Sequence, residues 1–412
     1  MTRSPDPDGS VLLGGEGAGN LLRAAVEHRG GSLVTWALDH IDTEPGRSTT
    51  ATFRVVVDWS YGRRTELLGV SVRAQGVHGN DERAEIFADG TREVAVWIHP
   101  DDPDLPGLAR AVYPDRMAEV LRETGAWGGA EGTLGAGGEV GLEMVGYRPR
   151  RRAVVRVDLP GAGRCYVKVL RADHVGEVMA RHDLMERSGV SAPRILGASR
   201  DHLVVLSELP GRSLAQAVLE EDSPCPPQDV LALLDSLPAE VAALPRRRPW
   251  SDAVDHYAGI VARCLPGQRR RLDRLVATVT DGLAGVGPGD EPTHGDLHEG
   301  QLHVQGSRVS GMLDIDTLGP GRRADDLACL VAHLSTIQRM DPTQRVRVEA
   351  LLGRWLPVFD ERVDPVELRL RAAGVAVSLA TGPYRGQEAD WAEQTEAILD
   401  VAEGWARAAR TS

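Results

Sequence analysis

The stretch that decides the fold is Thr293–Val304, THGDLHEGQLHV, followed from Gly311 by GMLDIDTLGPGRRADDLA. It sets imidazole, carboxylate and amide side chains around glycines, a composition typical of a tight polar loop. The short apolar runs on either side of Ser307 predict two strands joined by a hairpin at Ser307–Met312. The polar residues before and after that hairpin are therefore expected at one edge of a cleft.

Three of these polar side chains have the chemistry that phosphoryl transfer requires. The reaction needs a carboxylate that orients and deprotonates an attacking hydroxyl, and Asp296, directly after Gly295, suits that task. It also needs oxygen ligands for Mg²⁺. Gln301 and Asp314 offer an amide oxygen and a carboxylate, five and eighteen residues after Asp296.

The two histidines of the stretch raise the alternative of a zinc site. His294 and His298 have the i, i+4 spacing that can bind zinc on a helix. The preceding glycine favours a loop, and the sequence marks no third nitrogen or sulfur ligand. We expect His294 to bond the backbone and shape the loop, and His303 and His333 to be core or surface residues.

The whole segment resembles the aminoglycoside phosphotransferase and choline kinase family, which shares the protein-kinase-like fold. The resemblance covers about residues 135 to 400 and includes the H-G-D-x-H-x-x-N motif. Gln301 stands where the family most often has Asn, and the form H-G-D-x-H-x-G-Q is similar to maltokinase-like members. The resemblance implies Asp296 as catalytic base, Asp314 and Gln301 as Mg²⁺ ligands, and Asp326 as a structural carboxylate that holds the loop.

The upstream half contains the only lysine of the chain, because 46 of the 47 basic residues are arginine. Lys168 lies in the strand-like run RCYVKVL, where the resemblance implies the lysine that binds ATP phosphates. A helix glutamate usually holds that lysine, and Glu177 is our choice, with Glu186 as the alternative. The run VVLSELPGRSL is similar to the family's hinge, so Glu208 and Leu209 are expected to offer backbone groups to adenine.

The residues that precede this upstream half are predicted to form a separate β-rich module. The expected strands are Ser32–Leu38, Thr50–Asp58, Glu66–Arg73 and Arg92–His99, and a helix is expected over Pro114–Glu123. The first twenty residues, rich in Gly, Asp and Pro, are expected to be frayed. The acidic run Asp101, Asp102 and Asp104 lies among prolines and reads as a solvated turn.

The order of elements predicts an α+β chain, a protein-kinase-like bilobal fold preceded by a β-rich domain. Seven glycines within 128–141 mark the best boundary. We expect an N-terminal cap domain over 1–127, a small β lobe over 128–210 and a helical lobe with the catalytic loop over 211–412. In the small lobe we expect strands at 140–145, 153–157, 165–170 and 202–206 and a helix at 172–188.

Composition limits the cellular setting and the partners. The net charge of −13 argues against nucleic acid or an anionic membrane surface as partners. The four cysteines, Cys165, Cys225, Cys264 and Cys329, form no close pair. Without a spanning segment or an apparent secretion signal, a cytoplasmic protein is expected.

We therefore predict an ATP- and Mg²⁺-dependent kinase that phosphorylates a hydroxyl of an aminoglycoside or sugar-like small molecule. A neutral sugar, as in maltokinase-like enzymes, is the first alternative. A pseudokinase or nucleotide-binding scaffold is the second. The substrate, the oligomeric state and the role of residues 1–127 stay open.

Overall fold

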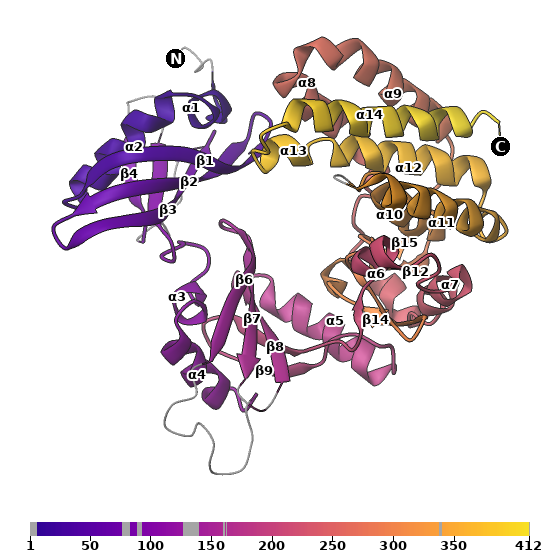
Figure 1. Cartoon of the computed structure of the whole chain (residues 1–412), viewed down its shortest axis with the longest axis horizontal. Helices are drawn as coiled ribbons and strands as arrows, with labels where there is room; N and C mark the ends of the chain where they lie inside the picture. Colours follow the sequence, from indigo (N-terminus) through magenta and orange to yellow (C-terminus); the bar gives the residue numbers. More distant parts are fainter. Residues whose placement is uncertain are drawn as a thin grey trace. The chain divides into compact units, whose positions relative to one another are not determined.

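The chain is described from a computed structural model (Figure 1). The structure describes residues 6–75, 83–88, 93–126, 140–159, 161, 163–337 and 340–411. Contacts divide the chain into two compact units. The first runs to Gly176 and includes 195–208 and 385–388; the second contains 177–194, 209–384 and the C-terminal segment from Ala389. Most of the predicted boundary at 128–141 lies outside the described residues.

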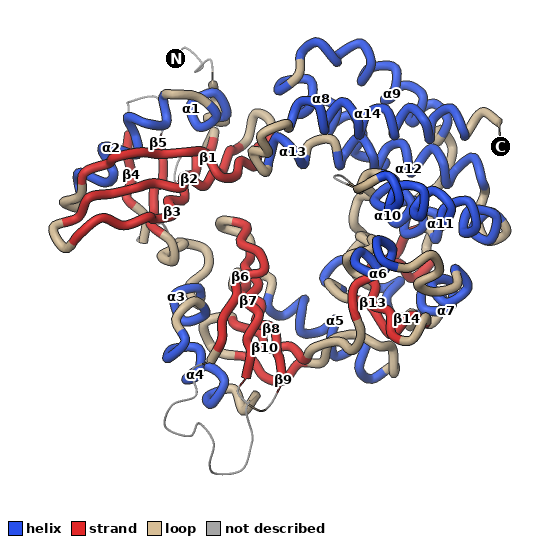
Figure 2. Tube along the Cα trace, viewed as in Figure 1, coloured by secondary structure: helices blue, strands red, loops and turns tan. Residues whose placement is uncertain are grey.

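The first unit begins with an antiparallel sheet in the order β1-β2-β3-β5-β4 (Figure 2). Its strands are β1 (Ser32–Glu44), β2 (Ser48–Trp59), β3 (Gly62–Arg73), β4 (Glu85–Ala88) and β5 (Glu93–Ile98). Alternate residues of β2 are buried, as expected for a strand with one face on a core. All four predicted strands are present, and each is part of this sheet.

Two helices contradict the prediction of a frayed N-terminus. α1 (Ser10–Gly14) and α2 (Gly17–His28) pack against β1 and β2. Leu13, Leu22 and Val26 are fully buried. The Asp6 carboxylate accepts the N–H groups of Val11 and Leu12 at 3.1 and 3.0 Å, which supplies acceptors to the first turn. Burial of the apolar helix face therefore outweighs the low helix propensity of the glycines.

The second sheet of this unit has the order β6-β7-β8-β10-β9. Its strands are β6 (Gly141–Arg148), β7 (Arg152–Leu159), β8 (Gly163–Leu170), β9 (Ile195–Ala198) and β10 (Leu203–Ser207). Two helices, α3 (Leu108–Ala111) and α4 (Pro114–Glu123), share one apolar core with this sheet. The predicted helix at 114–123 is confirmed with the same bounds, and β9 is an addition.

A buried aspartate joins the two sheets of the first unit. The Asp102 carboxylate is fully buried and accepts the Tyr147 hydroxyl at 2.7 Å and the Arg150 N–H at 2.8 Å. Tyr147 lies in β6, and its oxygen accepts the indole N–H of Trp97 in β5 at 3.2 Å. The prediction of a solvated turn is therefore wrong for Asp102, because its partners are far away in the sequence.

The second unit is mainly helical and encloses one large apolar core (Figure 1). Its longer helices are α5 (Val175–Arg187), α6 (Leu214–Glu220), α7 (Pro227–Asp235), α8 (Val254–Cys264), α9 (Arg269–Gly282), α10 (Arg323–Ser335), α11 (Pro342–Asp360), α12 (Pro365–Leu379) and α14 (Trp391–Ala408). α12 lies in the middle, in contact with α8, α9, α10 and α14. Its residues from Leu370 to Ser378 are all buried, so the helix forms the centre of this unit.

Short strands and turns complete the second unit around the motif stretch. β11 (Arg212–Ser213), β13 (Leu302–Gln305) and β14 (Arg308–Met312) form one sheet, and β12 (Glu291–Thr293) pairs with β15 (Gly319–Gly321). The remaining pieces are α13 (Gly382–Arg385) and the 3₁₀ turns η1 (Ala239–Ala243), η2 (Ser251–Ala253), η3 (Pro266–Gln268) and η4 (Ile315–Thr317). A hairpin joins β13 and β14 as predicted, but its turn is residues 306–307, and most of the predicted connection Ser307–Met312 forms strand β14.

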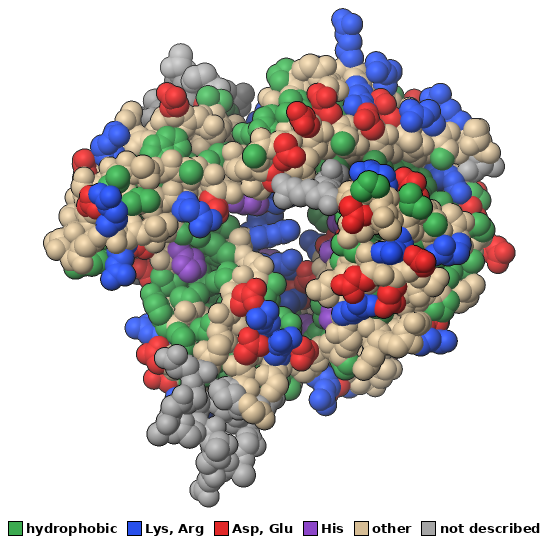
Figure 3. Space-filling model, in the orientation of Figure 1, with side chains coloured by type: hydrophobic (Ala, Val, Ile, Leu, Met, Phe, Trp, Pro, Cys, Tyr) green, Lys and Arg blue, Asp and Glu red, His purple; other side chains and the backbone are tan. Residues whose placement is uncertain are grey.

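On the face drawn in Figure 3, basic and acidic side chains are interspersed rather than gathered by sign. Many of them pair, as Arg271 does with Asp400 and Glu403. Among the helices that the structure describes, none has both the length and the apolar content to cross a membrane.

Candidate active site

The loop between β12 and β13, residues 294–301 and called the catalytic loop below, is anchored by a buried carboxylate. Asp326 is 1% exposed, and its two oxygens accept the N–H groups of His294 at 2.9 Å and Gly295 at 2.8 Å. It lies in the first turn of α10, where the helix dipole favours a negative charge. The predicted role of Asp326 as a structural carboxylate is confirmed.

Two further contacts fix the start of the catalytic loop. Nε2 of His294 bonds the carbonyl oxygen of Leu313 at 2.8 Å, and the Thr317 hydroxyl donates to the His294 carbonyl at 2.6 Å. Gly295 has a φ of 80°, and a Cβ there would lie 2.6 Å from the Thr317 carbonyl oxygen. Only glycine fits this position without strain. His294 therefore shapes the loop, as predicted.

The Asp296 side chain follows this turn and is held by an aromatic neighbour. The indole N–H of Trp250 donates to Oδ1 of Asp296 at 3.1 Å. The Cys329 thiol lies 4.0 Å from the same oxygen, and burial raises the pKa of that thiol well above its usual value. The thiol therefore stays protonated and contributes a weak donor, so one oxygen of Asp296 is oriented from two sides.

The β13–β14 hairpin brings the two predicted metal ligands to one edge. Leu302 pairs with Met312, and the Leu313 N–H donates to the Gln301 carbonyl at 2.7 Å. Gln301 and Asp314 therefore lie at neighbouring ends of the same hairpin. Both offer oxygen donors, the type that Mg²⁺ prefers, so the donor set fits this ion.

The backbone at Asp314 is left-handed, with φ 50° and ψ 49°. Among residues with a side chain, Asn and Asp adopt this region most readily. The turn directs the chain from β14 into η4. The position thus selects an aspartate or asparagine on conformational grounds alone, independently of any ligand.

The remaining predicted site residues are divided between the units. Lys168 lies in the middle of β8, paired with Val154 and Val204, and is 6% exposed. Glu208 ends the segment of the first unit that contains β10, and its carboxylate lies 3.5 Å from Arg164. Leu209 is the first residue of the next segment, which belongs to the second unit, and is buried.

The predicted partner of Lys168 has another neighbour in its own helix. Glu177, in the first turn of α5, lies with its side chain 60% exposed and 3.4 Å from Nη1 of Arg181. Arg181 is buried, and its Nε donates to the carbonyl of Leu318. The pairing of Lys168 with Glu177 stays a prediction.

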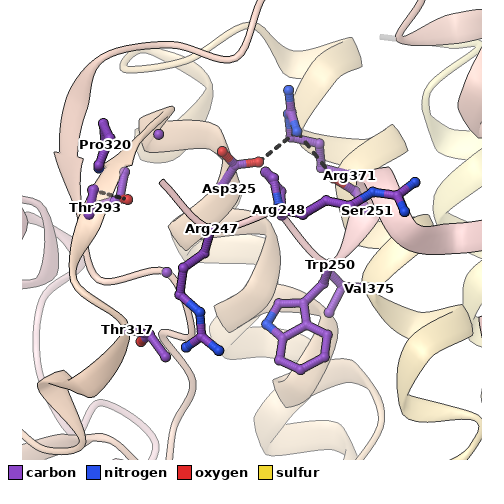
Figure 4. Close-up of a pocket in the computed structure, with 14 residues that line it drawn as sticks. Arg247, Arg248, Trp250, Ser251, Thr293, Thr317, Pro320, Asp325, Arg371 and Val375 are labelled. Atoms are coloured by element: carbon purple, nitrogen blue, oxygen red, sulfur yellow. Dashed lines mark hydrogen bonds and ion pairs between the residues drawn. The ribbon is translucent and has the colours of Figure 1, made fainter. Parts of the chain in front are cut away.

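A small pocket of about 30 Å³ adjoins the catalytic loop within the second unit. In Figure 4, Arg247, Trp250 and Thr317 lie on one side, and Asp325 and Arg371 lie on the other. Arg371 is buried and bonds Asp325 at 2.6 Å. Burial raises the pKa of Asp325 to about 6, against the lowering effect of Arg371.

The arginines at the pocket differ in how they are bound. Arg248 donates to the Asp252 carbonyl and lies 3.4 Å from Asp255. Arg247 is exposed and has no hydrogen-bond or ion-pair partner among the residues that the structure describes. The sequence analysis did not identify the segment PRRRPW, which ends at Trp250, as part of the site. Nothing in its residues indicates a contact with a loop more than forty residues later.

Comparison with known proteins identifies the family. The model of the phosphotransferase enzyme family matches residues 144–362, more than half of the 412 residues. No curated protein matches the sequence.

Solved structures that resemble the chain include three phosphotransferases. A choline kinase from Cryptosporidium parvum Iowa II has 12% identity and a TM-score of 0.47, covering 71% of this chain and 95% of its own. A choline/ethanolamine kinase family protein from Mesorhizobium loti has 15% identity and a TM-score of 0.47, covering 72% and 99%. A macrolide 2′-phosphotransferase from Brachybacterium faecium has 18% identity and a TM-score of 0.41, covering 69% and 98%.

The family match and the order of elements confirm the predicted α+β, protein-kinase-like fold with a preceding β-rich region. They also confirm the prediction that the chain is a phosphotransferase. With the motif stretch folded as a loop and hairpin inside the matched range, the chain belongs to the phosphotransferase enzyme family.

Proposed function

We propose that the protein is an ATP-dependent kinase that transfers the γ-phosphoryl group to a hydroxyl of a small molecule, an aminoglycoside or a sugar. The observation that carries the proposal is the catalytic loop, in which Asp296 follows a glycine turn anchored by Asp326. Gln301 and Asp314 lie across the adjoining hairpin. This arrangement supplies a base and two oxygen ligands from one short segment.

Each residue would have a distinct task in the transfer. Asp296 accepts the proton of the acceptor hydroxyl as its oxygen attacks the γ-phosphorus, and the bond to the β–γ bridging oxygen breaks. Lys168, helped by Glu177, neutralises the α- and β-phosphates. Glu208 and Leu209 offer backbone groups to adenine. Gln301 and Asp314 would hold Mg²⁺, which would supply positive charge to the triphosphate.

Trp250 extends the predicted set as a positioning residue. It donates to one oxygen of Asp296 and so restricts the rotation of that carboxylate. A carboxylate held in one rotamer acts as a base from a fixed point, which lowers the entropy cost of reaching the reactive geometry.

A neutral sugar is the second candidate acceptor, and the pocket beside the catalytic loop favours it. Arg247, Arg248 and Arg371 line that pocket with a single acid, Asp325, which already pairs with Arg371. A polycationic aminoglycoside would be repelled by the unpartnered Arg247, whereas sugar hydroxyls can accept its N–H groups. A pseudokinase remains the alternative in the absence of turnover.

The test is phosphoryl transfer by the purified full-length chain with ATP, Mg²⁺ and a panel of neutral sugars, amino sugars and aminoglycosides. Wild type is expected to form a phosphorylated acceptor, and Asp296→Asn is expected to lose at least ~10²-fold in rate. Asp183→Asn, which alters an exposed pair with Arg187 on α5, serves as the matched control. Equal ATP consumption by wild type and Asp296→Asn would contradict the assignment of the base.

A further inference from the structure

A group of three side chains, two from the catalytic loop and one from α10, has no role in the proposed transfer. His298 and Glu299 belong to the loop, and His333 lies in the last turn of α10. Their ligand atoms all lie within 4.8 Å of one another. We call these three residues the loop–helix cluster.

The carboxylate of the cluster lies between two imidazole rings. Oε2 of Glu299 is 3.9 Å from Nδ1 of His298 and 3.8 Å from Nδ1 of His333. These separations are too long for hydrogen bonds. Oε2 is buried and has no hydrogen-bond partner. A buried polar atom without a partner costs free energy, and an ion in the space between the three side chains would supply the missing interaction.

The two imidazole rings of the cluster lie face to face. They stack with centroids 4.6 Å apart and an angle of 12° between their planes. Nε2 of His298 lies 3.0 Å from Nε2 of Gln301, whereas Nδ1 of each ring lies within 4 Å of the Glu299 carboxylate. Imidazole nitrogen is a common metal ligand.

We propose that the loop–helix cluster binds a transition-metal ion of the zinc class, through the two imidazoles and the Glu299 carboxylate. Two histidines and one glutamate are an established donor set for zinc, with a fourth position left for water. Imidazole nitrogen disfavours Mg²⁺, which takes oxygen ligands, so the cluster favours a different ion from Gln301 and Asp314, although His298 contacts the Gln301 side chain at 3.0 Å. The side chains of the three residues are 15 to 23% exposed, which gives an ion a path to them.

Binding would connect the catalytic loop to α10 and has a local cost. The Gly300 N–H lies 3.1 Å from Nδ1 of His298, and an ion at that nitrogen replaces this contact. The N–O separations between the ligand atoms, 3.8 and 3.9 Å, must also shorten slightly before one ion can lie ~2.0–2.2 Å from each of them. The site therefore resembles one that closes around its ion rather than one that is rigidly preformed.

The experiment titrates Co²⁺ into the tag-free, full-length chain after dialysis against a chelator. We expect one equivalent to bind with visible absorption bands of nitrogen-ligated Co²⁺. Stoichiometric Zn²⁺ should remove these bands, whereas millimolar Mg²⁺ should leave them. His333→Gln and Glu299→Gln are each expected to weaken binding at least ~10-fold.

His256→Gln is the matched control, since His256 lies on α8 outside the cluster. Circular dichroism and thermal unfolding check that each variant is folded. Because the two substitutions lie on different elements, the test still works if one variant does not fold. Absence of Co²⁺ and Zn²⁺ binding to wild type would overturn the proposal. Binding that both folded variants retain unchanged would also overturn it. Because metal binding is measured directly, the result does not depend on any kinase activity.

Discussion

The indole N–H of Trp250 donates to Oδ1 of Asp296 at 3.1 Å, across 46 residues of sequence. Trp250 directly precedes η2, whereas Asp296 lies in the loop after β12. The fold thus fixes the rotamer of a loop carboxylate from a distant element. The consequence for turnover can be measured.

Trp250→Phe keeps an aromatic ring but removes this donor. We expect kcat to fall ~10-fold or more, because Asp296 then samples rotamers in which it does not face the acceptor. The KM for ATP should change less than twofold, because Trp250 has no proposed contact with nucleotide. Steady-state kinetics in both substrates checks the split, and an unchanged kcat would remove Trp250 from the positioning role.

Asp326→Asn exchanges one of two acceptor oxygens for an NH₂ group that faces a backbone N–H. We expect the free energy of unfolding to drop by about 1–3 kcal/mol. The exposed Asp183→Asn should shift it by less than ~0.5 kcal/mol. Denaturant unfolding of the two variants measures the difference. Equal values would mean that the catalytic loop does not depend on Asp326.

Asp314→Asn isolates charge from backbone conformation, since asparagine also tolerates the left-handed region. The melting temperature should stay within ~2 °C of wild type, because the chain path is preserved. Mg²⁺-dependent ATP binding should weaken at least ~10-fold, which isothermal titration with and without Mg²⁺ measures. Asp314→Ala, in contrast, should also lose stability, because alanine is strained at this φ.

Tyr147→Phe removes the hydroxyl that donates to the buried Asp102 and accepts from Trp97. The first unit should lose about 1–3 kcal/mol, the cost of leaving a buried group unsatisfied. Tyr61→Phe is the control, because Tyr61 is 68% exposed and stacks on Trp59. Tryptophan fluorescence during urea unfolding separates the two variants; identical transitions would refute the role of Tyr147.

His40 should make the protein sensitive to acid. Burial lowers the pKa of His40 below 6.5, assisted by the nearby cations Arg385 and Arg148 and opposed by Asp42 and Asp39. Below pH 6.5 the unfolded chain therefore takes up a proton that the folded chain does not, and stability falls as the pH drops. His40→Gln should flatten this decline between pH 7.5 and 5.5, whereas an unchanged slope would assign the acid sensitivity elsewhere.

Much of the fold was predictable because local sequence patterns indicate its strands and helices. The valine-rich runs of β2 and β5 predict strands, and Pro114 at the start of α4 marks a helix start. The spacing of Asp296, Gln301 and Asp314 predicted a loop and a hairpin, which the structure confirms. In these segments each residue's preference agrees with its environment.

The missed features depend on partners that are distant in the sequence. From its neighbours in the sequence, Asp102 is predicted to be a turn residue. In the structure it is buried and accepts hydrogen bonds from Tyr147 and Arg150, more than forty positions away. His298 and His333 stack with ring centroids 4.6 Å apart, although they come from different elements. No local sequence pattern predicts such contacts, since they depend on how whole helices and strands pack.

The single lysine, Lys168, allows the opening of the sheet that contains β8 to be measured separately from the rest of the chain. A protease that cuts only after lysine has one target in the entire chain, the bond following Lys168, and β7 and β10 protect that bond on both sides. Cleavage into two fragments would therefore time the opening of this one sheet, undisturbed by fraying elsewhere.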